Sequence, residues 1–231
     1  MKNKGYYNEK VLDKFAGALA DAKELVNTGA DLRVRISNAN SKMGAVASVS
    51  TLPFITCPGC CRDTCGAKCY AAKLANFRPS VLESYAINTA LAMLRPELYW
   101  QQVNAAIFAV RFFRFHVSGD IMNDDYFAHM IDAARNNPHT EILCFTKRFA
   151  VVNKYLDNGG EIPANLHILF SGWDNLAPVN PYSMPETNVF KDESGIRDGW
   201  KICGGNCFNC ACRGVGCWQA VKGDTIAFKL H

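Results

Sequence analysis

The region between residues 113 and 173 alternates short apolar segments with amphipathic ones, and this alternation constrains the fold more than any other feature. The apolar segments at 113–121, 141–148 and 166–173 are rich in β-branched and aromatic residues and are apolar on both faces. The segments between them, 123–137 and 149–160, have the apolar spacing of helices. Strands buried on both faces and joined by helices are typical of a parallel sheet covered by helices.

The alternation returns about every 25 residues, which predicts an α/β fold built as a complete or partial (β/α) TIM-like barrel. The alternative is a doubly wound open sheet, which ordinarily begins with a glycine-rich turn, and no GxGxxG motif follows a strand in this sequence. The chain has 231 residues, 49% of them hydrophobic, so residues 1–231 are expected to form one domain around a large core.

The N-terminal part of the chain predicts a helix over 9–30 that ends near Asn27–Gly29. Two short strands are expected at 31–40 and 45–55. Residues 70–113 are expected to be largely helical, and the prolines at 79 and 96 are expected to open new helices.

Each of the three predicted strands between 113 and 173 ends in polar residues. Because the carboxyl ends of barrel strands carry the functional site, we expect these residues to meet around one mouth. Any one of them alone is equally typical of a turn or a helix cap. The residues expected to act in catalysis are Asp120, Lys147 and Arg148, and those expected to bind a cofactor are His116, Ser118, Gly119 and Ser171.

The chain has eleven cysteines, of which five lie between Cys57 and Cys69 and five between Cys203 and Cys217. No apolar leader opens the sequence, and the most apolar stretch, 105–115, is short and contains two arginines. We therefore expect no membrane association and a cytoplasmic location. Disulfides are rare in such a compartment, and metal binding is the usual role of clustered cysteines there. Cys144 stands apart, as a buried strand residue.

The C-terminal cysteines have the irregular spacing that iron–sulfur clusters accept. Structural zinc sites generally use two CxxC turns, whereas only one, Cys207 to Cys210, is present. The pattern predicts a 4Fe-4S cluster, and the x3-x2 triplet is also that of radical S-adenosylmethionine enzymes, where it lies near the start of the chain. The expected ligands are Cys203, Cys207, Cys210 and Cys217, with Cys212 as the spare.

The earlier cysteines lie directly after a predicted strand, where a cluster-binding loop would begin. Their spacing gives a three-thiolate set, Cys57, Cys65 and Cys69, with Cys61 as an alternative ligand. Either a second 4Fe-4S cluster or a zinc ion suits such ligands, so the sequence leaves one cluster or two open.

The motifs TCPG, CGAKCYA, FRFHVSGDI, ILCFTKR, ILFSGW, CGGNCFNC and GCW together resemble the phage gene product 88-like family, from about Thr56 to the C-terminus. The SGD, FTKR and CYA elements are also similar to a second phage family, related to radical S-adenosylmethionine proteins and spore photoproduct lyase. The resemblance implies a mobile-element origin and an iron–sulfur barrel. It maps the family's cysteines onto Cys57, Cys65, Cys69, Cys203, Cys207, Cys210 and Cys217, and it marks Cys60, Cys61 and Cys212 as additions.

The favoured function is an iron–sulfur enzyme whose open iron binds S-adenosylmethionine or a substrate at the barrel mouth. Lys147, Arg148 and Asp120 would hold a small anionic or zwitterionic ligand there, and such an enzyme needs an electron donor. One alternative is a non-catalytic electron carrier or redox sensor. A second is a zinc-stapled nucleic-acid-binding module, which the net charge of +4 and the lack of a dense basic stripe do not favour.

Overall fold

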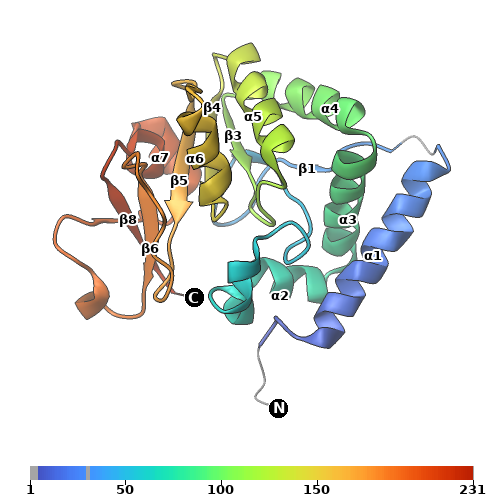
Figure 1. Cartoon of the computed structure of the whole chain (residues 1–231), viewed down its shortest axis with the longest axis horizontal. Coiled ribbons are helices and arrows are strands. Elements are labelled where there is room, and N and C mark those ends of the chain that lie inside the picture. Colours follow the sequence, from blue (N-terminus) through green and yellow to red (C-terminus); the bar gives the residue numbers. More distant parts are fainter. Residues whose placement is uncertain (1–4, 30–31, 231) are drawn as a thin grey trace.

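The structure, a computed structural model, describes residues 5–29 and 32–230. Helix α1 (Glu9–Asn27) begins where Asn8 accepts a hydrogen bond from the backbone N–H of Val11, and it ends at Thr28, as predicted. It packs along α3 (Figure 1). The long helical region predicted after the first cysteines is confirmed, and the two prolines open helices there: α2 (Tyr70–Phe77), α3 (Pro79–Leu94) and α4 (Pro96–Phe108).

The predicted alternation of strands and helices is also confirmed. It consists of β3 (Phe112–Phe115), α5 (Asp124–Asn136), β4 (Glu141–Thr146), α6 (Phe149–Asp157) and β5 (Leu166–Ser171). Asn123 starts α5 by accepting a 2.8 Å hydrogen bond from the backbone N–H of Tyr126. The two early strands are much shorter than expected, β1 (Ile36–Ser37) and β2 (Ala47–Val49), and Asp31 of the first predicted strand lies outside the described residues.

All eight strands of the described residues form one sheet in the order β1-β2-β3-β4-β5-β6-β8-β7. The remaining strands are β6 (Glu186–Phe190), β7 (Lys201–Ile202) and β8 (Thr225–Lys229). Only β1 and β2 pair antiparallel, and every other pair is parallel. The complete barrel is not formed, because β1 and β7 are edge strands of two residues that pair on one side only.

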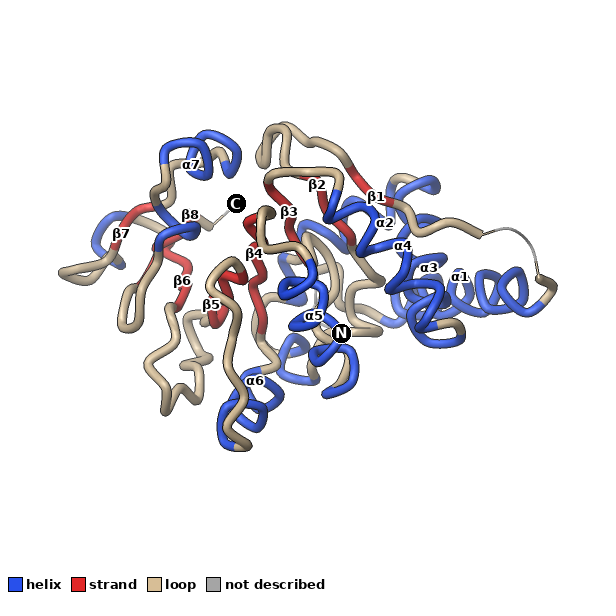
Figure 2. Tube along the Cα trace, turned by 90° about the horizontal axis from the view of Figure 1, so that it is seen from above, coloured by secondary structure: helices blue, strands red, loops and turns tan. Residues whose placement is uncertain are grey.

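The two faces of the sheet carry separate cores, because successive side chains of a strand point to opposite faces. Phe113, Ile142 and Ile168 belong to the main core, which α1 to α6 cover. Phe112 and Leu143 belong to a second core, which includes Trp218 of the 3-10 turn η4 (Gly216–Gln219) and residues of α7 (Cys207–Arg213). Figure 2 shows α5 and α6 on one side of the strands and α7 on the other.

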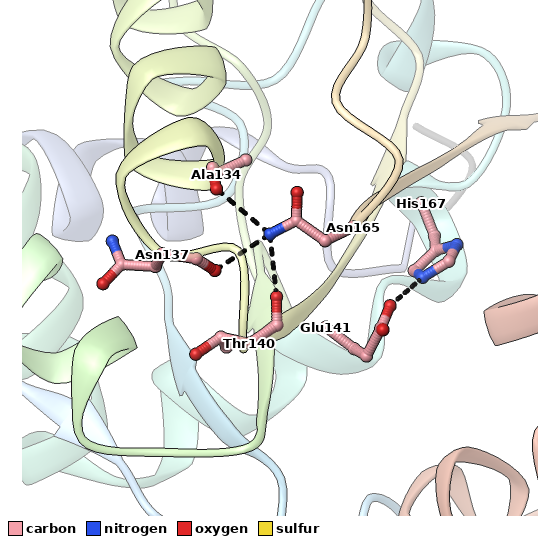
Figure 3. Close-up of polar contacts among 6 residues, drawn as sticks. All are labelled: Ala134, Asn137, Thr140, Glu141, Asn165 and His167. Atoms are coloured by element: carbon pink, nitrogen blue, oxygen red, sulfur yellow. Dashed lines mark hydrogen bonds and ion pairs between the residues drawn. The ribbon is translucent and has the colours of Figure 1, made fainter.

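The segments before β4 and β5 are tied together at the end of the strands where each begins (Figure 3). The side-chain amide of Asn165 donates to the carbonyls of Ala134, Asn137 and Thr140 at 2.9–3.1 Å. His167 of β5 lies 2.6 Å from the carboxylate of Glu141 on β4. These contacts fix how β4 and β5 lie side by side, and therefore where their far ends place their polar residues.

The other short elements are the 3-10 turns η1 (Gly59–Arg62), η2 (Gly66–Lys68) and η3 (Glu193–Gly195). Within the described part of the chain, no helix combines the length and apolar character needed to cross a bilayer.

Candidate functional site

A large cavity of about 890 Å³ opens between the ends of β3, β4 and β5 and the loops that carry the cysteines. Residues from the predicted polar ends of all three strands line it. Both sets of cysteines line it too, although they are more than a hundred residues apart in the chain. The first cysteine group comprises Cys57, Cys61, Cys65 and Cys69, and the second comprises Cys203, Cys207, Cys210 and Cys217.

The first cysteine group lies around two consecutive turns: Cys57 precedes η1, Cys61 lies within it, and Cys65 and Cys69 flank η2. Cys61 is buried at its centre, and its thiol hydrogen-bonds to the sulfur atoms of Cys57 and Cys65. These hydrogen bonds raise the pKa of Cys61. The hydrogen bond from Cys61 lowers the pKa of Cys65, and the charge of Lys147 acts in the same direction. From the sequence, Cys61 was only an alternative ligand. In the structure its thiol lies between the sulfur atoms of Cys57 and Cys65.

Cys69 joins the first cysteine group to helix α2. Its sulfur accepts a 3.4 Å hydrogen bond from the backbone N–H of Ala72 and thereby caps the helix. Burial raises the pKa of its thiol to about 12. Tyr70 follows, and its hydroxyl donates to the carbonyl of Val117 at 2.5 Å, which ties the start of α2 to the end of β3.

Cys203 of the second cysteine group follows β7, Cys207 and Cys210 lie on α7, and Cys217 lies on η4. An earlier loop supports α7. The backbone N–H groups of Cys207 and Phe208 donate to the carbonyls of Lys42 and Met43 at 3.4 and 2.9 Å. Gly44 lets this loop approach, because its φ is 66° and an added Cβ would lie 2.7 Å from Cβ of Phe208.

Backbone groups crowd the sulfur atoms of the second cysteine group. The N–H of Gly205 donates to the sulfur of Cys203 at 3.4 Å. An added Cβ at Gly204 or Gly216 would lie 3.3 or 3.7 Å from the sulfur of Cys210. Donation from backbone N–H groups and close backbone approach are features of iron–sulfur sites.

The four thiols of the second cysteine group lie close enough to influence one another. Burial is the main cause that raises the pKa of Cys210 and Cys217, and the charges of Cys203 and Cys207 raise both further. The described residues nevertheless contain no group of three or more His, Cys, Asp or Glu side chains already arranged as a metal site. The thiols are therefore gathered around the cavity without the geometry of a formed coordination shell.

Asp120, expected to act in catalysis, is buried and has its carboxylate oxygens occupied. One oxygen accepts from the backbone N–H of Ile121 and the hydroxyl of Thr146 at 2.8 and 2.6 Å. The other accepts from the backbone N–H of Lys147 at 2.8 Å. Burial raises the pKa of Asp120, and these hydrogen bonds oppose the rise. Asp120 lines the cavity, but it joins the ends of β3 and β4 and has little capacity left for a ligand.

Lys147 and Arg148 are neighbours in sequence, but only Lys147 lines the cavity. The ammonium of Lys147 lines the cavity, donates to the hydroxyl of Ser171 at 2.6 Å and lies 5.9 Å from the ring centre of Trp173. Arg148 is not among the residues that line the cavity. Its guanidinium instead donates to the carbonyl of Thr56 at 2.9 Å, just before the first cysteine group.

The residues expected to bind a cofactor all line the cavity, and several also hold its wall. The hydroxyl of Ser118 donates to the carbonyl of Thr51 at 2.9 Å. Gly119 has a φ of 79°, and an added Cβ would lie 2.0 Å from the hydroxyl of Thr51. His116 is buried with a φ of 57° and bonds to Tyr126 at 3.1 Å, while burial lowers its pKa to about 3.

Arg114 is the residue whose importance the sequence did not reveal. It lies on the face of β3 that points toward α7, close to the second cysteine group. Arg111, which precedes β3, is exposed. The signal was available in the alternation of β3, because Arg114 shares its face with Phe112, but that face could not be recognised as the cavity side. Six cationic side chains line the cavity against one carboxylate: Arg35, Lys42, Lys68, Arg114, Lys147 and Lys229, with Asp120.

Comparison with known protein families identifies the family to which the chain belongs. A family model described as Gene product 88 matches residues 18–225, which is most of the chain. The chain therefore belongs to the Gene product 88 family, which confirms the first of the two resemblances drawn from the motifs. Comparison with curated proteins and with solved structures found no match. Nothing in these comparisons extends to the radical S-adenosylmethionine resemblance.

Proposed function

We propose that this phage-family protein is an iron–sulfur enzyme whose substrate enters the cavity between the two cysteine groups. The observation that carries the proposal is that eight cysteines from two distant segments line one cavity, and that cationic side chains accompany them. Thiolates are the ligands of iron–sulfur clusters, and neighbouring positive charge stabilises both the thiolates and an anionic ligand.

The second cysteine group would close a 4Fe-4S cluster with four thiolates. Its glycines allow the backbone to wrap near the sulfur atoms, and the Gly205 N–H that already donates to Cys203 is the kind of contact that clusters use. Since the thiols are not yet arranged as a metal site, binding would draw them together by small shifts of α7 and η4.

The first cysteine group would hold a second cluster and leave one iron open. It lies at the end of an early strand and leads directly into α2 through Cys69. Lys147 faces this group, since its charge acts on Cys60 and Cys65, and its ammonium is held by Ser171 at the cavity wall. An ammonium in this position can bind a carboxylate or phosphate of a small anionic or zwitterionic ligand.

The ligand that best combines with an open iron is S-adenosylmethionine, whose amino and carboxylate groups bind there in radical enzymes. When bound, such a cluster would supply an electron to the ligand, and the electron would come from a separate donor. The chain's own residues would orient the ligand: Lys147 at its carboxylate and Trp173 at the wall beside it.

The test uses anaerobically purified and reconstituted protein. We expect iron and sulfide in the protein, a change in the paramagnetic resonance of the reduced cluster when S-adenosylmethionine is added, and formation of 5′-deoxyadenosine. A bound cluster with an unchanged spectrum and no 5′-deoxyadenosine would instead support the electron carrier or redox sensor. Stoichiometric zinc in colourless protein would contradict the iron–sulfur proposal and leave the zinc-stapled module.

A further inference from the structure

Arg114 is half-buried and places its guanidinium at the cavity wall beside the second cysteine group. The guanidinium lies 4.5 Å from the ring centre of Phe145, on the inner face of β4. One of its terminal nitrogens lies 3.7 Å from the sulfur of Met43 and 4.0 Å from the sulfur of Cys207. Its Nε is buried and has no hydrogen-bond partner. The side chain is thus held in one direction by packing, with sulfur atoms as its nearest polar neighbours.

The charge of Arg114 has no carboxylate partner among the described residues, whose ion pairs all lie elsewhere. An arginine stays protonated at any physiological pH, so the charge persists. A partly buried charge without a partner is unfavourable, and proteins normally compensate such a charge with an anion. Arg114 therefore implies an anion that the polypeptide's carboxylates do not provide.

Two anions could serve: a small ligand in the cavity, or the second cysteine group in its metal-bound form. The contacts favour the second, because the sulfur of Cys207 is the nearest cysteine sulfur, at 4.0 Å from a terminal nitrogen of Arg114. The ammonium of Lys147, by contrast, is held by the hydroxyl of Ser171 at 2.6 Å, at the end of β5.

We propose that Arg114 is the counter-charge of the cluster held by the second cysteine group and raises the reduction potential of that cluster. The inference rests on the proposed function, because it needs a cluster at these cysteines. A cluster closed by four thiolates is anionic, and reduction makes it more negative. A fixed positive charge at short range in a partly buried site stabilises the reduced form more than the oxidised one. Arg114 would act through the cluster as a tuning residue and would not touch the substrate.

The experiment compares the reduction potentials of iron-loaded wild type, Arg114→Gln, Arg114→Lys and Arg111→Gln. Arg111→Gln removes the same charge from an exposed position over the ring of Phe112, where water screens it, and serves as the matched control. At a fixed applied potential we expect the ratio of reduced to oxidised second cluster to fall at least tenfold in Arg114→Gln. That ratio corresponds to about 59 mV for a one-electron couple.

Arg114→Lys keeps the charge on a shorter, more strongly hydrated group, so its potential should fall in the same direction by less. Arg111→Gln should match wild type. If Arg114→Gln does not fold, the downward shift in Arg114→Lys alone tests the proposal. Iron-loaded Arg114 variants with the wild-type potential would overturn it, and weaker binding of S-adenosylmethionine at that unchanged potential would reassign Arg114 to the ligand. Wild-type protein without iron and sulfide would overturn this proposal and the proposed function together.

Discussion

The two cysteine groups share one cavity but differ in what surrounds their sulfur atoms. In the first, thiols hydrogen-bond to one another around the buried Cys61, and a lysine held by Ser171 faces them from the end of a strand. In the second, backbone groups approach the sulfur atoms closely, and a guanidinium packed on an aromatic ring lies beside them. The ammonium of Lys147 at the cavity wall suits an exchangeable anionic ligand, whereas the guanidinium of Arg114, 4.0 Å from the sulfur of Cys207, suits the charge of a bound cluster. The difference supports an open first site and a closed second site.

Different residues also hold the two cysteine groups in place. Substitution of Trp218, which packs beside the second group, is expected to cause the largest loss of stability. Its buried indole contacts Phe112, and its N–H donates to the carbonyl of Cys207 at 3.0 Å. We expect Trp218→Ala to lower the free energy of unfolding by about 3–5 kcal/mol, since it removes a buried aromatic and leaves a cavity. Denaturant unfolding measures this loss.

Trp173→Ala is the control on the side of the first cysteine group. Trp173 is half-buried, with its ring beside the ammonium of Lys147, so its loss should cost roughly 1 kcal/mol. Thiol labelling should then show the second cysteine group exposed in Trp218→Ala alone. Equal losses of stability in the two variants would show that the supports of the two groups are not separate.

Gly119 gives the next largest effect, and it acts on the first cysteine group. An alanine there would hold an unfavourable positive φ and place its Cβ 2.0 Å from the hydroxyl of Thr51 and 2.5 Å from that of Thr56, next to Cys57. We expect Gly119→Ala to cost about 2–4 kcal/mol in thermal or denaturant unfolding. Gly159→Ala has a similar φ of 76° with no atom within 4 Å, so it should cost only about 1–2 kcal/mol. If both variants lose the same stability, the close contact at Gly119 is not what holds this loop.

The pH dependence of stability tests the environment of His116, which lines the cavity shared by the two cysteine groups. The pKa of His116 is about 3 in the folded protein, against an ordinary value of 6.5, because burial disfavours the charged ring. Between these values the unfolded chain binds more protons, so stability is lost as the pH falls. We expect a loss of about 2 kcal/mol between pH 7 and pH 5 from this residue. In His116→Asn the loss over this interval should shrink by that amount. An unchanged pH profile would show that the pKa of His116 is the same in the folded protein as in the unfolded chain.

Much of the fold could be predicted between Glu9 and Trp173, because apolar spacing there follows the periods of helices and parallel strands. The sheet beyond β5 could not, since β6 (Glu186–Phe190) has polar residues in its centre and β7 is only two residues long. The open edge of the sheet follows from these short strands, and no pattern in the sequence marks it.

The sequence predicted many of the residues that line the candidate site, but it did not predict what each side chain does there. The strand-end rule correctly placed Lys147 and Ser171 at a cavity, and cysteine spacing selected residues that line it. The roles expected for Asp120 and Arg148 could not be judged from the sequence. Their polar atoms form hydrogen bonds with backbone groups, and the sequence does not reveal such bonds. Arg114 differs because its role depends on which face of β3 the second cysteine group covers.

The most direct test of the central claim is the iron and sulfide content of four anaerobically reconstituted proteins: wild type, Cys65→Ser, Cys207→Ser and Cys212→Ser. Cys212 is exposed and does not line the cavity, so its variant is the matched control. The account predicts iron and sulfide in the wild type and the control, and about half of each in the other two, because each of those variants disables a different cluster. Wild-type protein that binds only zinc, or variants that keep the full iron content, would contradict the account.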